Sequence, residues 1–150
     1  MNVYYLDTSA AVKRYVQEIG TSWIQALADP KQGHSLFLVR LTQEEIVSAI
    51  TRKETKGQTI STANAAKALT DFDLDFTLQY LIIEVSSALV RRAVLLARKH
   101  ALRGYDAMQL AAALEIYAVE PALIFVSADL ELNTAAMTEG LSMEDPNRHP

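Results

Sequence analysis

The stretch YYLDTSAAVKRY, residues 4–15, places an ionisable aspartate at the end of an apolar run and directly before a helix-forming segment. Residues 2–6 are aromatic and β-branched, which predicts a buried strand. Asp7, Thr8 and Ser9 follow, and each of these side chains can cap a helix. A strand that leads straight into a helix is typical of an α/β unit. Asp7 is therefore either a helix cap or the first member of a charged site, and the other acids of the chain bear on the choice.

The same alternation continues along the chain. Apolar, β-branched composition predicts three further strands, at residues 35–41, 80–85 and 123–129. Apolar residues at helical spacing predict helices between them: from residue 8 to Gly20, around 23–27, from Thr42, from 63 to about 69, around 89–97, from Asp106, and up to about Glu139. Strands that alternate with helices predict an α/β fold, with a parallel sheet covered on both faces.

Two ends of these segments carry more specific expectations. Thr42 opens its predicted helix with Glu45 at the spacing of a capping box, in which the two side chains bond to each other's backbone amides. The tail after Gly140 is short and is expected to be extended.

The composition limits the classes of protein to consider. Half of the 150 residues are hydrophobic, so we expect one domain, residues 1–150, with a buried core. The net charge of −4 gives no general attraction for nucleic acid, which would need a local basic patch. The absence of cysteine excludes disulfides, zinc–thiolate sites and thiol nucleophiles. Because Asp7 comes too early for a signal peptide and no apolar run could span a membrane, we expect a cytoplasmic protein.

Four acids are predicted to meet at one edge of the sheet. Asp7 ends the first strand, Asp129 ends the fourth, and Glu45 and Asp106 lie in the first turns of helices. Ligands of such folds bind beyond the carboxyl ends of the strands. Grouped carboxylates repel one another unless a hard cation such as Mg²⁺ lies among them. Each aspartate is equally well explained as a helix cap, so spacing alone leaves a metal site and a set of caps both open.

Other candidate sites have weaker patterns. The run DFDLDF, residues 71–76, lacks the glycine and terminal glutamate of a calcium loop, and a solvated face is expected there. The three histidines, His34, His100 and His149, have no metal-binding spacing and are expected at the surface. No nucleophile elbow and no phosphate-binding loop occurs.

Four segments together resemble the PIN-domain ribonucleases, and within them the VapC-type toxins of bacterial toxin–antitoxin pairs. The segments are YYLDTSAAVKRYVQEIG (4–20), LTQEEIVSAITRK (41–53), LRGYDAMQLAAAL (102–114), and FVSADLEL (125–132) with EGL (139–141). Their order and separation extend the resemblance over nearly the whole chain. It implies a three-layer α/β/α fold with a twisted, mainly parallel sheet.

The resemblance also implies a site and an activity. Asp7, Asp106 and Asp129 match the family's acidic positions and are expected to hold Mg²⁺ or Mn²⁺. Glu45, with Glu44 as the alternative, is expected to help bind the metal or orient the attacking water. The activity implied is that of an endoribonuclease that hydrolyses RNA phosphodiesters.

Supporting residues and partners follow from the same resemblance. The hydroxyls of Thr8 and Ser127 are expected to support the site. Relatives pair with a small antitoxin protein that inserts into the active-site cleft, and they usually form homodimers, so both are expected here.

Three rival interpretations remain to be weighed against this one. A phosphatase of the haloacid-dehalogenase type needs a second aspartate two residues after Asp7, where Ser9 stands. A receiver domain needs a phosphoacceptor after the third strand, where Ser86 and Ser87 stand. A catalytically inactive PIN-like module would serve only as a binding scaffold, and the four retained acids argue against it.

Overall fold

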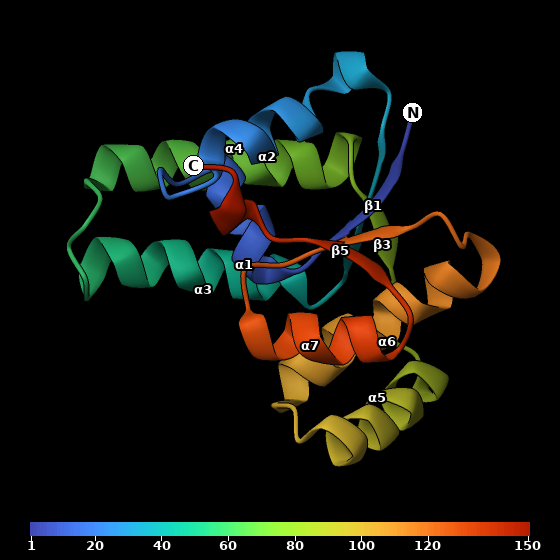
Figure 1. Cartoon of the computed structure of the whole chain (residues 1–150). Helices are drawn as coiled ribbons and strands as arrows, with labels where there is room; N and C mark the ends of the chain where they lie inside the picture. The colour runs from blue at the N-terminus through green and yellow to red at the C-terminus, as the bar shows by residue number, and fades with distance from the viewer.

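The computed structural model describes residues 1–150 as a five-stranded sheet between two layers of helices (Figure 1). The strands are β1 (Val3–Leu6), β2 (Ser35–Val39), β3 (Leu81–Ile83), β4 (Ile124–Val126) and β5 (Ser142–Glu144). Their order is β3-β2-β1-β4-β5, and every neighbouring pair is parallel. The predicted α/β/α architecture is confirmed. The tail that was expected to be extended forms β5, a fifth strand beside β4.

The two helical layers follow from the alternation of side chains along the strands. Tyr4 and Leu6 enter one core and Tyr5 enters the other, because successive strand residues point to opposite faces. The first layer holds α1 (Thr8–Ala11), the 3₁₀ turn η1 (Val12–Arg14), α2 (Thr21–Ala28), α3 (Thr42–Thr55) and α4 (Thr62–Leu78). The second holds α5 (Ser87–His100), α6 (Gly104–Val119) and α7 (Leu130–Thr138). Two short 3₁₀ turns complete the chain, η2 (Pro30–Gln32) and η3 (Pro146–Arg148).

Two helices differ in extent from the prediction. The first helical segment ends with η1 rather than at Gly20, which is the N-cap of α2 with a φ of 88°. A Cβ at Gly20 would lie 2.3 Å from the carbonyl oxygen of Pro146, so only glycine fits. The helix predicted to end near residue 69 runs on through DFDLDF to Leu78. Phe72 and Phe76 lie four residues apart and are both buried, which is helical spacing.

Two helix starts near the sheet edge also differ. Helix α3 has Leu41 as its N-cap with no side-chain hydrogen bond, so the predicted capping box was wrong. The Thr42 hydroxyl is instead buried and accepts a hydrogen bond from Gln109. Helix α6 begins at Gly104, so Asp106 is its third residue rather than its first. Both differences leave Glu45 and Asp106 in first turns, as expected.

The strand order places a topological switch at the centre of the sheet. From β1 the chain builds β2 and β3 on one side, and then β4 and β5 on the other. Such a switch leaves a crevice at the carboxyl ends of the two central strands, here β1 and β4. The amide of Asp7 donates to the carbonyl of Val126 (3.1 Å), which closes the ladder at this edge. None of the helices combines the length and the apolar character needed to cross a bilayer.

Candidate active site

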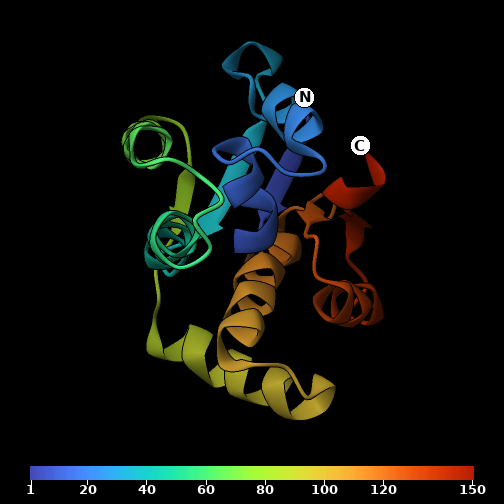
Figure 2. The same cartoon turned by 90° about the vertical axis from the view of Figure 1, so that its left-hand side faces the viewer.

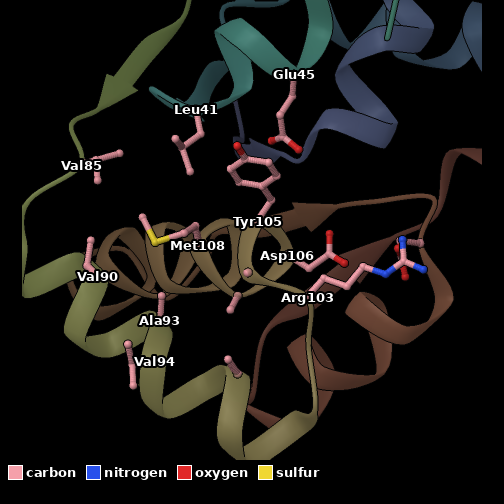
Figure 3. Close-up of a pocket in the computed structure, with 14 residues that line it drawn as sticks. Leu41, Glu45, Val85, Val90, Ala93, Val94, Arg103, Tyr105, Asp106 and Met108 are labelled. Carbon is pink, nitrogen blue, oxygen red and sulfur yellow. The ribbon is translucent and has the colours of Figure 1, made fainter. Parts of the chain in front are cut away.

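A cleft of about 750 Å³ lies at this edge of the sheet, bordered by the starts of α3, α6 and α7 and by one side of α5. One end of the cleft is charged, with Glu45, Asp106, Asp129 and Arg103 in its lining. The other end is apolar, and Figure 3 shows Val85, Val90, Ala93 and Val94 there, away from Glu45 and Asp106. Glu45, Asp106 and Asp129, which come after β2, β3 and β4 in the sequence, therefore line one cavity.

Asp7 lies at the end of β1 and is almost completely buried. It is the N-cap of α1, because its Oδ1 accepts from the Ala10 amide (3.2 Å) and from the Ser9 hydroxyl (2.7 Å). Burial raises the pKa of Asp7 from 3.8 to about 7, and the charge of Asp106 adds to this rise, while the hydrogen bonds oppose it. Asp7 is thus a helix cap and also an electrostatic neighbour of Asp106.

Asp106 and Asp129 line the charged end of the cleft, and the buried Asp7 is their neighbour through the charge of Asp106; we call these three residues the aspartate group. Burial raises the pKa of Asp106, and the charges of Asp129 and then Glu45 add to the effect. Arg103 offsets part of this rise, but neither Asp106 nor Asp129 forms a salt bridge. The group therefore concentrates negative charge with little compensation from the protein.

Asp129 is held by the turn between β4 and α7. Its Oδ1 accepts from the Leu132 amide (3.0 Å), so it caps α7, and its own amide donates to the Ser127 hydroxyl (3.1 Å). Ser9 donates to Asp7 and accepts from the Ala128 amide (2.9 Å), which joins the turn to the end of β1. The two predicted caps at Asp7 and Asp129 are real, and both carboxylates still lie at the same sheet edge.

Glu45 is held by a closed set of hydrogen bonds among Tyr5, Thr8, Thr42, Glu45 and Gln109, which we call the glutamate clamp. Its Oε1 accepts from the Thr8 hydroxyl (2.8 Å) and from Gln109 Nε2 (2.9 Å). The same amide nitrogen lies 3.1 Å from the Thr8 hydroxyl and 3.0 Å from that of Thr42. The Tyr5 hydroxyl donates to Gln109 Oε1 (2.6 Å). Both bonds to Glu45 end on Oε1, so Oε2 has no protein donor.

Several of these residues were not predicted as parts of the site. Gln109, Tyr5, Thr42 and Ser9 carry the hydrogen bonds just described, yet none of them is ionisable near neutral pH. A signal for Gln109 was present, since it is the one amide in the run of alanine and leucine that forms the buried face of α6. Of the two candidate glutamates, Glu45 faces the cleft, and Glu44 is exposed on the outer side of α3.

The oxygen donors match what Mg²⁺ and Mn²⁺ bind, because these hard ions prefer carboxylates and water. In the side-chain positions of this structure, no group of three or more His, Asp or Glu residues is arranged so that it could hold a metal ion. Mg²⁺ commonly uses one or two carboxylates and keeps several waters, so a smaller direct set is compatible with this chemistry. The aspartate group, with its uncompensated charge, is the place where such an ion would be most strongly attracted.

The fold and the acidic cleft define a class of protein, the small three-layer α/β proteins with carboxylates gathered at the strand ends. Residues 4–136 match the PIN domain family, and the chain belongs to this family. This confirms the resemblance found in the four sequence segments.

Known relatives are similar over most of their length. The chain is 32% identical over 140 residues, 93% of each protein, to Ribonuclease VapC45 of Mycobacterium tuberculosis strain CDC 1551 / Oshkosh, and equally to Ribonuclease VapC49 of strain H37Rv. Among solved structures it resembles VapBC2 from Rickettsia felis bound to a promoter DNA fragment, with a TM-score of 0.61 and 15% identity over 95% of this chain and 98% of that one. PAE2754 from Pyrobaculum aerophilum also gives 0.61, with 18% identity over 98% and 91%. At these identities the structures support the fold alone.

Proposed function

We propose that this protein is an endoribonuclease that hydrolyses RNA phosphodiester bonds with the help of Mg²⁺ or Mn²⁺, and that it acts as the toxin of a toxin–antitoxin pair. The observation that carries the proposal is the meeting of Glu45, Asp106 and Asp129 in one cleft, with the buried Asp7 close enough to sense the charge of Asp106, and with the pKa of Asp7 and Asp106 raised. The two mycobacterial relatives, which are named ribonucleases, support the same reaction class.

Each acid has a distinct part in the proposed reaction. Asp106 and Asp129, with Asp7 behind them, would supply the oxygens that hold the ion directly or through water. A divalent ion there would neutralise charge on the phosphate and lower the pKa of a bound water. Glu45 Oε2 would accept a hydrogen bond from the attacking water, because Oε1 is already occupied by Thr8 and Gln109.

The clamp makes the position of Glu45 independent of the ion. Gln109 and Thr8 fix the carboxylate from the sheet side, and the buried Tyr5 hydroxyl fixes Gln109 in turn. Ser127 helps to fix Asp129, because the Ser127 hydroxyl accepts a hydrogen bond from the Asp129 amide. A group held this way loses little further entropy when the substrate arrives, which is what catalytic positioning requires.

The proposal includes a protein partner. Solved proteins with this fold include VapBC2 from Rickettsia felis and VapBC-5 from Mycobacterium tuberculosis, a member of the VapBC family of toxin–antitoxin systems. A small antitoxin that inserts a cationic side chain between Asp106 and Asp129 would neutralise the charge that the structure leaves uncompensated. A homodimer is also expected, and light scattering on the purified chain would measure it.

The first experiment is cleavage of a mixed RNA pool by the purified chain with Mg²⁺, with Mn²⁺ and with chelator. We expect cutting only with a metal ion, and a loss of at least about 100-fold in Asp106→Asn, as removal of a group that stabilises the transition state typically costs. Asp73→Asn is the matched control, since Asp73 is an exposed aspartate of α4 outside the cleft. Wild-type rates in Asp106→Asn would overturn the site.

Absence of cutting in every condition is tested by a second measurement. A metal site stabilises the folded chain on binding, so Mn²⁺ should raise the midpoint of thermal unfolding. No cutting and no metal-dependent stabilisation would favour the inactive binding module over the nuclease.

A further inference from the structure

Basic residues are concentrated in one segment of this acidic chain. Residues 85–105 contain five of the 14 Lys and Arg residues and none of the 18 Asp and Glu residues. The rest of the chain is left with nine basic residues against 18 acidic ones. The segment consists mainly of α5, which lies at the far end of the molecule from both termini (Figure 2). The local basic patch that nucleic-acid binding would need is therefore present on one helix.

Helix α5 also forms the apolar wall of the cleft. Val90, Val94 and Ala97 line the cavity, and Val90 and Val94 are exposed to 43% and 61%. Arg91 and Arg98 lie three residues before and four residues after Val94, and residues at these spacings are neighbours on a helix surface. The two arginines do not line the cavity themselves; they lie beside Val94, on the side of α5 turned away from Ala93 and Ala97, at the rim of the cleft.

The remaining basic residues of α5 lie elsewhere. Arg92 and Lys99 are seven residues apart on the flank turned away from Val94, and Lys99 is bound to Glu139 (2.6 Å). Arg91 and Arg98 are exposed and form no salt bridge, and the same holds for Arg103 at the acidic end. The charges that border the cleft are thus free to bind an anion.

An exposed aromatic ring lies beside the acids. Tyr105 lines the cleft, is 54% exposed and directly precedes Asp106. Figure 3 shows its ring between Glu45 and Asp106, at the junction of the charged and apolar ends. No hydrogen bond engages its hydroxyl within the chain, so the ring is held only by its place at the start of α6. A flat face in this position can stack on a nucleobase.

We propose that α5 and Tyr105 form the surface that holds the RNA strand, with Arg91 and Arg98 on its phosphates and Tyr105 against the base beside the acids. This rests on the proposed function and specifies how its substrate binds. The apolar wall would lie against unstacked bases, which single-stranded RNA exposes and a duplex does not. The strand would run along α5 from its start toward Arg103 and the aspartate group.

Charge favours this occupant over a second copy of the chain. A two-fold dimer built on α5 would bring together two segments that each carry five basic residues and no acidic one, so their charges would repel. An apolar peptide would fit the valines but would leave Arg91 and Arg98 unpaired. A polyanion with flat apolar bases satisfies both features of the wall.

The test is binding of a labelled single-stranded RNA, measured by fluorescence anisotropy over a range of KCl concentrations, in chelator and with Ca²⁺. Arg91→Gln and Arg98→Gln should each weaken binding several-fold and lower the slope of log affinity against log salt by about 0.7. Arg92→Gln removes the same charge from the other flank of the same helix, and should change affinity less than twofold. Thermal unfolding confirms that each variant is folded.

Tyr105 is tested by a pair of substitutions. Tyr105→Leu should weaken RNA binding roughly 5- to 100-fold, and Tyr105→Phe should restore it, because stacking needs the ring and not the hydroxyl. A duplex of the same sequence should bind more weakly than the single strand. Equal loss in Arg92→Gln and Arg98→Gln, or unchanged binding in Tyr105→Leu, would overturn the inference, and so would a wild-type chain that binds no RNA.

The result separates this inference from the proposed function. A chain that cleaves RNA but is unaffected by the Arg91, Arg98 and Tyr105 variants remains a nuclease with a different substrate path. A chain that binds single-stranded RNA through these residues but never cleaves it would confirm the RNA-binding surface and contradict the proposed reaction. In the cleaving enzyme, Arg98→Gln should raise KM and leave kcat nearly unchanged, as expected for uniform binding.

Discussion

The glutamate clamp and the aspartate group lie side by side at the same sheet edge and are stabilised in opposite ways. In the clamp, Glu45 and Gln109 have hydrogen-bond partners of 2.6 to 3.1 Å, and the carboxylate accepts two donors. In the aspartate group, burial raises the pKa of Asp7 and of Asp106, and the charges of neighbouring acids add to both rises. The clamp is satisfied within the protein except at Glu45 Oε2, whereas the aspartate group lacks a paired positive charge.

The difference assigns separate tasks to the two halves. The clamp fixes a carboxylate that needs no cation, whereas the aspartate group stores repulsion that a cation would relieve. Changes in the aspartate group should therefore depend on pH and metal. Changes in the clamp should depend on neither.

The largest expected effect concerns Asp7 and pH. Its folded pKa, about 7, lies above its ordinary value of 3.8, so the folded state holds the proton more tightly than the unfolded state. The stability that this gives is fully present below about pH 3.8, falls as pH rises because the unfolded carboxyl ionises first, and levels off above about pH 7, a loss of up to about 4 kcal/mol in total. Asp7→Asn keeps the Oδ1 acceptor and cannot ionise, so its free energy of unfolding relative to wild type should grow from about pH 4 to about pH 7 and then stay constant to pH 8.

Urea unfolding in chelator across this pH range measures the effect. Only the difference between the two proteins is informative, because other carboxylates titrate in both. Asp73→Asn, an exposed change, should give a profile parallel to wild type. If the profile of Asp7→Asn were also parallel to wild type, the pKa of Asp7 would not be raised in the folded state.

The second effect tests the clamp. Gln109→Leu keeps the size of the side chain but leaves the buried hydroxyls of Tyr5 and Thr42 without their partner. Unpaired buried polar groups cost about 1–3 kcal/mol each, so we expect a loss of about 2–4 kcal/mol in the free energy of unfolding. The loss should be the same with chelator and with Mg²⁺. Gln17→Leu makes the same change at an exposed position and should be nearly neutral. A metal-dependent loss in Gln109→Leu would contradict the separation of the two halves.

The third effect, that of Asp106→Asn, is a small gain in the free energy of unfolding, opposite in sign to the loss expected for Gln109→Leu. Asp106→Asn removes one of the repelling charges, so in chelator it should raise the free energy of unfolding, by about 1 kcal/mol or less because Asp106 is partly solvated. Wild type should gain stability on addition of Mn²⁺ and the variant should gain less. Calorimetric scans with and without the ion measure both changes. A destabilised Asp106→Asn in chelator would mean that Arg103 already compensates the charge.

The aspartate group could be predicted from sequence because its positions are tied to local patterns. Asp7 directly follows an apolar run and Asp129 lies three residues past one, and the carboxyl ends of parallel strands meet at one edge. Asp106 could be predicted because it lies in the first turn of an alanine-rich helix that follows the third strand. The three layers follow from the alternation of strands and helices, with only β5 missing, since its residues Ser-Met-Glu lack the apolar, β-branched run that marks the equally short β3 and β4.

The clamp could not be predicted because its bonds connect distant positions. Tyr5 and Gln109 are 104 residues apart, and Gln109 and Glu45 are 64 apart. Neutral hydroxyls and amides carry no charge signal, and local rules gave Thr42 and Glu45 a different pairing, the capping box. Tertiary contact with Gln109 replaced that local pairing.

The last effect, that of Tyr5→Phe, is similar in size to the third, and it tests whether the clamp acts as one unit. The variant keeps the ring, which stacks on Phe125 at 5.7 Å, and removes only the hydroxyl that donates to Gln109. We expect a loss of about 1 kcal/mol, with cleavage reduced only a few-fold because Thr8 still holds Glu45. In the double variant with Gln109→Leu, neither partner is left unpaired, so the total loss should fall short of the sum by about 1 kcal/mol. Additive losses would mean that Tyr5 and Gln109 stabilise the fold separately, and that the clamp does not act as one unit.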